Sequence, residues 1–123
     1  MTSRRALLVG AAGLLLPSDA RADRADPRPQ YGLASWYGGR QHHGKPMASG
    51  RRFDEWADNA AHRTLPLGTR CRVRHLGTGR TATVVILDRG PFVAPRILDV
   101  SHGTARALGG ELQGVFPVEL VPL

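Results

Sequence analysis

Residues 69–87, which read TRCRVRHLGTGRTATVVIL, decide the fold class of this chain. Cys71 and Val73 alternate with three arginines, and a period of two is the side-chain pattern of a β-strand with one buried face. The Gly-Thr-Gly sequence at 77–79 is typical of a hairpin turn, and residues 81–87 supply an apolar returning strand. The stretch therefore predicts a two-stranded hairpin in which Cys71 is a small buried side chain.

Short strands and turns are expected along the rest of the chain as well. Fifteen glycines and nine prolines among 123 residues indicate many turns and few long helices. Further strands are expected at residues 31–37, 60–66, 96–100 and 115–121. Ser101 is the expected N-cap of one short helix, which ends at Gly109-Gly110. The sequence therefore predicts a mainly β protein, a small six-stranded barrel with one short helix.

The first 22 residues have the features of an export signal. A pair of arginines at 4–5 precedes the apolar run 6–16, and Ala20-Arg21-Ala22 offers the small-x-small pattern of a cleavage site. The run is too short to cross a bilayer, which needs about 20 apolar residues. The paired arginines leave both the general and the twin-arginine export route open.

Three segments are therefore expected along the chain. They are a signal peptide at 1–22, a flexible proline-rich leader at 23–30 and a single domain at 31–123. Export places the protein in the periplasm or outside the cell. Because no cysteine lies near the cleavage site and no second apolar segment follows, we expect no stable membrane anchor.

Charge and cysteine usage restrict the partners. The formal net charge of +7 favours an anionic partner, such as nucleic acid, acidic lipid or an acidic polymer of the cell envelope. Export argues against nucleic acid, and no recognition-helix or zinc-finger pattern supports it. The single cysteine cannot form an internal disulfide, and His42-His43 lack a third ligand at a sensible spacing. We therefore expect a monomer with no metal and no cofactor.

Two polar residues stand where expected strands end. Asp88 follows the apolar run 83–87, and a carboxylate against an apolar wall can act as a general acid or base. Asp is also common at the first position of a turn, so Asp88 can equally be a turn residue. His62 can donate to a substrate oxygen or orient a carboxylate, or it can be structural. The residues alone do not decide between a functional and a structural role for either side chain.

Five ordered motifs resemble those of the rare lipoprotein A (RlpA-like) domain family. They are GLASWYG at 32–38, ASG with FD at 48–54, AAHRTLP at 60–66, DRGPF at 88–92 and ILDVS at 97–101. The resemblance runs from about Gly32 to Val121. It implies a double-psi β-barrel, a fold shared with expansins and some lytic transglycosylases. It also implies action on the glycan strands of peptidoglycan, in some members on strands stripped of their peptides.

The resemblance implies roles for particular residues. Asp88, in the DRGP turn, is the expected catalytic acid/base, and His62 is the functional histidine of the AAHRTLP motif. Substrate contacts are expected from Tyr37, Ser49, Arg51, Arg89 and Asp99. In a lytic transglycosylase the 6-hydroxyl of muramic acid attacks its own C1, so one carboxyl group can serve as acid and then as base. The expected activity is endolytic cleavage to 1,6-anhydro-muramic products.

Two departures from the family pattern keep an alternative open. Arg51 stands where the family commonly has Glu, and Leu87 stands where it commonly has Asn. In the alternative, the protein is an expansin-like peptidoglycan-binding module that grips glycan without cutting it. A third class is a secreted inhibitor or interaction domain that uses the barrel only as a scaffold. The enzyme would release anhydro products. The binding module would be retained on sacculi without releasing products. The interaction domain would do neither and would instead bind a protein partner.

Overall fold

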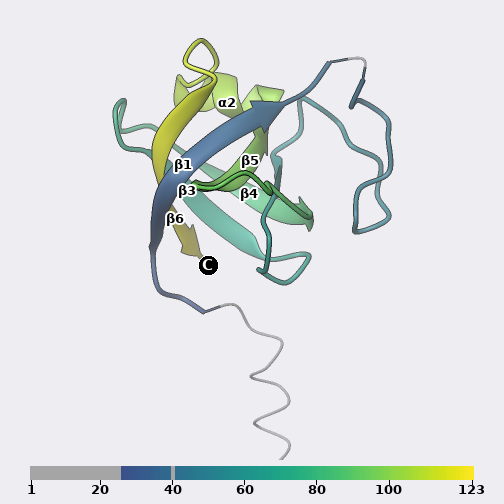
Figure 1. The fold of residues 1–123 in the computed structure, drawn as a ribbon, viewed down its shortest axis with the longest axis horizontal. Coiled ribbons are helices and arrows are strands. Elements are labelled where there is room, and N and C mark those ends of the chain that lie inside the picture. The colour runs from purple at the N-terminus through teal and green to yellow at the C-terminus, as the bar shows by residue number, and fades with distance from the viewer. Residues whose placement is uncertain (1–25, 40) are drawn as a thin grey trace, which may run out of the picture.

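The computed structural model describes residues 26–39 and 41–123, and the expected signal peptide lies outside them. Within these ranges the chain forms six strands and one helix, which are β1 (Gln30–Tyr37), β2 (Asn59–Ala61), β3 (Arg70–His75), β4 (Thr81–Asp88), β5 (Arg96–Ser101), α2 (His102–Leu108) and β6 (Val115–Pro122). The strands close into a barrel in the order β1-β5-β2-β4-β3-β6 (Figure 1). The predicted six-stranded barrel with one short helix is confirmed.

The strand order makes the barrel a mixed sheet. The pairs β1–β5 and β2–β4 are parallel, whereas β2–β5, β3–β4, β3–β6 and β1–β6 are antiparallel. Only β3 and β4 form the simple hairpin that the sequence indicates, with Cys71 opposite Val84. The short strand β2 lies between β4 and β5, so residues far apart in the sequence meet on either side of it.

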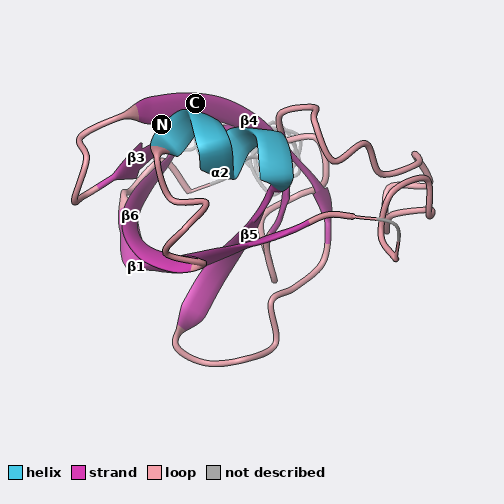
Figure 2. Ribbon diagram, turned by 90° about the horizontal axis from the view of Figure 1, so that it is seen from above, coloured by secondary structure: helices cyan, strands magenta, loops and turns pink. Residues whose placement is uncertain are grey.

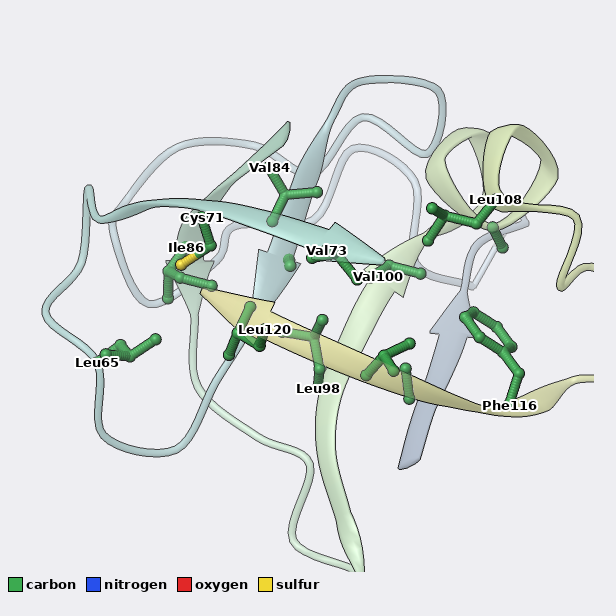
Figure 3. Packing of buried hydrophobic residues seen from close by; sticks show 14 residues of the cluster. Leu65, Cys71, Val73, Val84, Ile86, Leu98, Val100, Leu108, Phe116 and Leu120 are labelled. Carbon is green, nitrogen blue, oxygen red and sulfur yellow. The ribbon is translucent and has the colours of Figure 1, made fainter. Parts of the chain in front are cut away.

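The core fills the barrel with the inward-facing residues of every strand. Cys71 and Val73 of β3 are completely buried, while the neighbouring arginines 70 and 72 are exposed, as the alternation predicts. Burial also raises the pKa of the Cys71 thiol to about 11, so the thiol stays protonated at neutral pH. In Figure 3 the side chains of Leu98, Leu120 and Phe116 project into the same interior.

The helix α2 follows β5 directly and covers the barrel end at which β1 and β5 finish (Figure 2). The Ser101 side chain accepts a hydrogen bond from the amide of Thr104, and this is the N-cap that the sequence predicts. Gly109 adopts a left-handed φ of 79° and its amide donates to the carbonyls of Ala105 and Arg106. Ala105 and Leu108 bury the inner face of the helix in the core.

The loop between β1 and β2 is the largest irregular segment of the described chain. Its residues 41–58 extend from one side of the barrel in both views (Figures 1 and 2). A second apolar cluster of Met47, Phe53 and Leu87 attaches it to β4. A second attachment lies at α2, where the ring of His102 stacks between the rings of Trp36 and Trp56 at centroid distances of 4.3 and 4.7 Å.

Gly103 allows α2 and this loop to approach closely. Its amide donates to the carbonyl of Glu55 over 2.8 Å, and a Cβ atom at Gly103 would lie 2.6 Å from the carbonyl oxygen of Trp56. Such a separation is too short for a carbon and an oxygen in contact, and the clashing atom belongs to the backbone. The loop can therefore keep this position only while residue 103 has no side chain.

We expect Gly103→Ala to lower the free energy of unfolding by about 1–3 kcal/mol, because the new methyl displaces the backbone of Trp56. Helix propensity alone would act in the opposite direction, since Ala is favoured over Gly in a helix. Urea denaturation of this variant beside Ala107→Gly, on the exposed helix face, separates the two effects. A Gly103→Ala protein as stable as the wild type would contradict the close contact.

Candidate functional site

Two carboxylates lie on the outer face of the barrel in register with one another. Ser35 of β1 pairs with Asp99 of β5, Asp99 pairs with Ala61 of β2, and Ala61 pairs with Asp88 of β4. Residues directly opposite one another in a sheet share a face. Neighbouring strands are about 4.8 Å apart, so the backbones of Asp88 and Asp99 are separated by roughly 10 Å. The residue that lies between them in the sheet is Ala61, which is itself buried.

A β-bulge directs the Asp88 side chain to this face. Ala60 pairs with Ile86, but the next residue, Ala61, pairs with Asp88, so Leu87 is an extra residue in β4. Ile86 points into the core, whereas Leu87 packs outside the barrel against the β1–β2 loop. A bulge bends its strand and re-aims the side chain that follows. Sequence analysis predicted an uninterrupted strand here and therefore missed the bulge.

The Asp88 carboxylate is half-buried and held by the backbone. Its Oδ1 accepts hydrogen bonds from the amides of Ala48 and Arg89, each over 2.9 Å. No side chain in the described ranges 26–39 and 41–123 donates to its Oδ2 or forms an ion pair with it. The arrangement fixes one oxygen and leaves the other without a donor from the described residues, which is compatible with a general acid or base.

Arg89 does not pair with its neighbour Asp88. Its Nη1 instead donates to the carbonyls of His62 and Leu65, over 3.1 and 2.7 Å. The amide of His62 in turn donates to the carbonyl of Asp88 over 3.1 Å. Arg89 therefore ties the turn after β2 to the end of β4, behind the carboxylate.

Tyr37 and Asp99 complete the polar surface around Asp88. Asp99 accepts a hydrogen bond from the Ser35 hydroxyl, and Tyr37 stands two residues after Ser35, on the same face. The Tyr37 ring stacks on Phe53 at a centroid distance of 4.4 Å. Burial, and then the negative charges of Asp88 and Asp99, raise the pKa of the Tyr37 phenol above its ordinary range. Its buried hydroxyl has no hydrogen-bond partner in the described part of the chain.

His62 is buried, and both of its ring nitrogens are occupied. The Nδ1 atom accepts hydrogen bonds from the amides of Thr64 and Leu65, each over 3.0 Å. The proton must therefore sit on Nε2, which donates to Oε1 of Gln30 over 3.0 Å. Burial first, and then the charges of Arg63 and Arg89, lower the pKa of His62 to about 4. The ring is neutral at physiological pH and reaches Asp88 through its backbone.

His75, to which the sequence assigned no role, repeats this arrangement at the end of β3. Its Nδ1 accepts from the amides of Gly77 and Thr78, and its Nε2 lies 2.6 Å from Oε1 of Gln113. Both histidines thus satisfy the amides of the turn that follows them. Gln30 was also missed, because it was assigned to the leader, whereas it is the first residue of β1.

Ser49 and Arg51 lie in the β1–β2 loop beside β4. The Ser49 amide donates to the carbonyl of Leu87 over 3.0 Å, and the Ser49 hydroxyl accepts from the amide of Arg51 over 3.3 Å. The exposed side chain of Arg51 lines a pocket next to Leu87 instead of contacting Asp88. The structure thus brings Tyr37, Asp88 and Asp99 to one surface, with His62 and Arg89 at the adjoining turn, Ser49 in the neighbouring loop and Arg51 to one side.

Two further observations concern the described residues, 26–39 and 41–123. These ranges hold no group of three or more His, Cys, Asp or Glu side chains that could bind a metal ion. They also hold no helix whose length and apolar character would let it span a bilayer.

Comparison with known proteins finds one family and several relatives that resemble this chain. The family described as "Lytic transglycolase" matches residues 30–120. The "Probable endolytic peptidoglycan transglycosylase RlpA" of Synechocystis is 51% identical over 89 residues, which are 72% of this chain and 27% of that protein. The Aquifex aeolicus protein of the same name is 48% identical over 93 residues, which are 74% of this chain and 41% of that protein. This chain thus spans only about a quarter to two-fifths of the length of these relatives.

A solved structure shares the fold at low sequence identity. A mutant expansin of Clavibacter michiganensis, crystallised with cellohexaose, superposes with a TM-score of 0.64 at 20% identity. The match covers 78% of this chain and 50% of the expansin chain. It supports the double-psi barrel that the motifs imply.

We expect acid to destabilise the protein through His62. The folded pKa of about 4 lies below the ordinary value of 6.5, so the unfolded chain binds a proton that the folded chain excludes. The stability that comes from keeping His62 neutral is fully present above pH 6.5. As the pH falls towards 4, the free energy of unfolding decreases by roughly 2–3 kcal/mol for this reason. An NMR titration of the ring carbons gives the midpoint in the folded protein and in urea. A folded-state midpoint near 6.5 would contradict the observed contacts.

Proposed function

Since this chain belongs to the lytic transglycolase family, we propose that it cleaves peptidoglycan glycan strands at internal positions and releases 1,6-anhydro-muramic products. The observation that carries this proposal is the half-buried Asp88 carboxylate at the end of β4, where the amides of Ala48 and Arg89 hold one oxygen and no described side chain donates to the other. The relatives' names supply the reaction class, and the geometry supplies a group that can perform it.

One carboxyl group is sufficient for this reaction. Protonated Asp88 donates its proton to the glycosidic oxygen as the bond from C1 of muramic acid to that oxygen breaks. The 6-hydroxyl of the same sugar then bonds to C1, and its proton passes to the Asp88 carboxylate. The acid is regenerated and no water is consumed. Because the substrate supplies the nucleophile in place, a second catalytic carboxylate is not needed.

Asp99 and Tyr37 belong to substrate binding in this proposal. Asp99 lies two strands from Asp88, and both aspartates are half-buried on the outer face, so a glycan strand that runs across this face can contact both of them. The Tyr37 hydroxyl has no partner from the described residues, and a glycan hydroxyl can provide one. Ser49 contributes its hydroxyl from the loop edge beside Leu87.

His62 and Arg89 act as positioning residues. The His62 ring holds the turn at 62–65 through two amides, and the carbonyls of that turn hold the Arg89 guanidinium. The His62 amide fixes the carbonyl of Asp88. We therefore assign His62 to the geometry of the acid, since its ring nitrogens are both engaged elsewhere.

Peptidoglycan as the substrate requires an extracytoplasmic location. Residues 1–22 have the composition of an export signal, and we propose that they direct the protein to the periplasm or the exterior. The positive charge of the chain suits an acidic envelope polymer there.

We expect Asp88→Asn to remove anhydro-muramic products from a digest of purified sacculi, with a rate at least about 100-fold lower. The amide oxygen of Asn can still accept from Ala48 and Arg89, so the fold should persist. Mass spectrometry of the soluble fraction measures the products, and Asp26→Asn, at the start of the described chain, is the matched control. Wild-type protein that stays on sacculi and releases no products would support the non-catalytic binding module instead.

We expect Tyr37→Phe to separate binding from stability. Removing a buried hydroxyl without a partner should leave the free energy of unfolding unchanged or raise it by up to about 1 kcal/mol. Product release should nevertheless fall by about tenfold if the hydroxyl binds substrate. Tyr31→Phe is the control, because the exposed Tyr31 hydroxyl donates to Glu119 away from the site. A clear loss of stability in Tyr37→Phe would assign the hydroxyl to the fold.

A further inference from the structure

The loop between β4 and β5, residues 89–95, carries two exposed apolar side chains directly beyond the proposed acid. Gly90 and Pro91 are buried, whereas the next two residues, Phe92 and Val93, are 78% and 57% exposed. Phe92 is the most exposed aromatic side chain among the described residues. An aromatic ring left in water forgoes the free energy that its burial would supply. A ligand that covers the Phe92 ring would recover this free energy.

Phe92 lacks the partners of the other exposed aromatic residues. The Tyr31 hydroxyl donates to Glu119, and the Trp56 ring stacks on the ring of His102. The Phe92 ring stacks on no aromatic ring and meets no cation of the described chain, and it belongs to neither apolar cluster. The fold of the described residues therefore leaves most of this ring uncovered.

Hydrogen bonds order the loop on which Phe92 stands. The amide of Arg96 donates to the carbonyl of Val93 over 2.9 Å. Nη1 of Arg63 lies 3.2 Å from the carbonyl oxygen of Arg96 and 3.5 Å from that of Pro91, so it joins the first part of the loop to β5. Because the loop is held in place before a ligand arrives, binding at Phe92 costs less conformational entropy than binding at a free loop would.

The same loop borders the face that carries the two carboxylates. It connects Asp88, the last residue of β4, to β5, which contains Asp99. Phe92 is four residues after Asp88, so their Cα atoms are at most about 14 Å apart. A Cβ atom at Gly90 would lie 3.6 Å from Cε2 of Phe92, so the ring lies against the backbone that leads back to Asp88. A glycan strand that is bound at Asp88 can therefore reach the ring.

Cleavage at an internal position requires contacts on both sides of the bond that breaks. Asp99 and Tyr37 lie across β2 from Asp88 and offer a carboxylate and a hydroxyl. A pyranose ring also has an apolar face made of C–H groups, which these polar groups do not satisfy. An aromatic ring packs on such a face, and both surfaces then leave water. Phe92 supplies this apolar contact at the border of the same face.

We propose that Phe92 is a stacking platform for a sugar ring of the glycan strand, beside the sugar on which Asp88 would act. The inference rests on the proposed function. The ring has no polar atom, so it recognises the C–H face of a sugar and no particular substituent. Because the contact is remote from the reacting atoms, it stabilises bound substrate and transition state equally, which lowers KM and leaves kcat unchanged.

Titration with a peptide-free tetrasaccharide of alternating N-acetylglucosamine and N-acetylmuramic acid tests the platform. The titrations use the Asp88→Asn background, which should not cut the probe, and calorimetry measures the dissociation constant. We expect Phe92→Ala to weaken binding by about tenfold. Phe92→Tyr keeps the aromatic ring and should stay within about twofold, whereas Phe92→Leu, which is apolar without a flat face, should lose at least about fivefold. Val93→Ala, at the adjacent exposed position, is the matched control and should stay within about twofold.

The rate of product release from sacculi gives an independent measurement. With Asp88 intact, Phe92→Ala should raise the sacculus concentration that gives half the maximal rate by about tenfold, with the maximal rate changed by less than about twofold. A fall in the maximal rate alone would overturn the platform, because it would place Phe92 in the support of the acid. Since Phe92 is exposed, urea denaturation should give all its variants the stability of the wild type.

Several results of the titration would also overturn the proposal. These are no binding of the tetrasaccharide, an unchanged affinity in Phe92→Ala, and a wild-type affinity in Phe92→Leu. Weaker binding of Phe92→Ala to phosphatidylglycerol vesicles, with its glycan affinity unchanged, would assign the ring to a membrane surface instead.

The platform and the proposed activity can fail separately. Anhydro products from sacculi at the same rates and half-saturation for Phe92→Ala and the wild type would overturn the platform and leave the activity standing. Tetrasaccharide binding that depends on an aromatic ring at position 92, without products from sacculi, would support the platform and overturn the activity.

Discussion

The pairing of the short strand β2 with both β4 and β5 is the constraint on which the site depends. All three of its residues are buried, and it brings Asp88 of β4 and Asp99 of β5 to either side of Ala61. The two aspartates belong to strands that are not neighbours, so no local interaction could place them together. A larger side chain at position 61 would fill the space between them. The pairing of β2 and the bulge at Leu87 together bring two carboxylates to one face of the barrel.

Two buried histidines make the same pattern of hydrogen bonds but stabilise different parts of the structure. His62 follows β2 and His75 ends β3, and each accepts two turn amides at Nδ1 and donates from Nε2 to a glutamine. At His75 this arrangement closes the β3–β4 hairpin. At His62 the turn also carries the carbonyls that hold Arg89, so the same structural device positions a carboxylate. The residue type is the same in both places, whereas the sequences that follow differ, with RTLP after His62 and LGTG after His75.

The parts of the fold that depend on local patterns could be predicted from the sequence. The period of two in β3 and the cap at Ser101 each concern a few adjacent residues, and both were found. The bulge at Leu87 and the role of Gln30 depend on strands that pair across long sequence separations. Residues 83–87 therefore looked like an ordinary strand, and Gln30 looked like part of a leader until it was seen to accept from His62. The motif resemblance predicted a role for Asp88, but it could not show that the Arg89 side chain turns away from it.

The two departures from the family pattern act on different parts of the molecule. Leu87 packs against Met47 and Phe53, and this contact attaches the β1–β2 loop to β4. The same loop supplies the Ala48 amide that holds Asp88, so an apolar residue at 87 strengthens the support of the carboxylate. An asparagine in that cluster would need polar partners that its apolar neighbours do not provide. Arg51 changes the charge of the adjoining pocket and leaves the surroundings of Asp88 unaltered. These departures therefore concern the packing and charge of the loop, whereas the Asp88 carboxylate keeps the two amides that hold it.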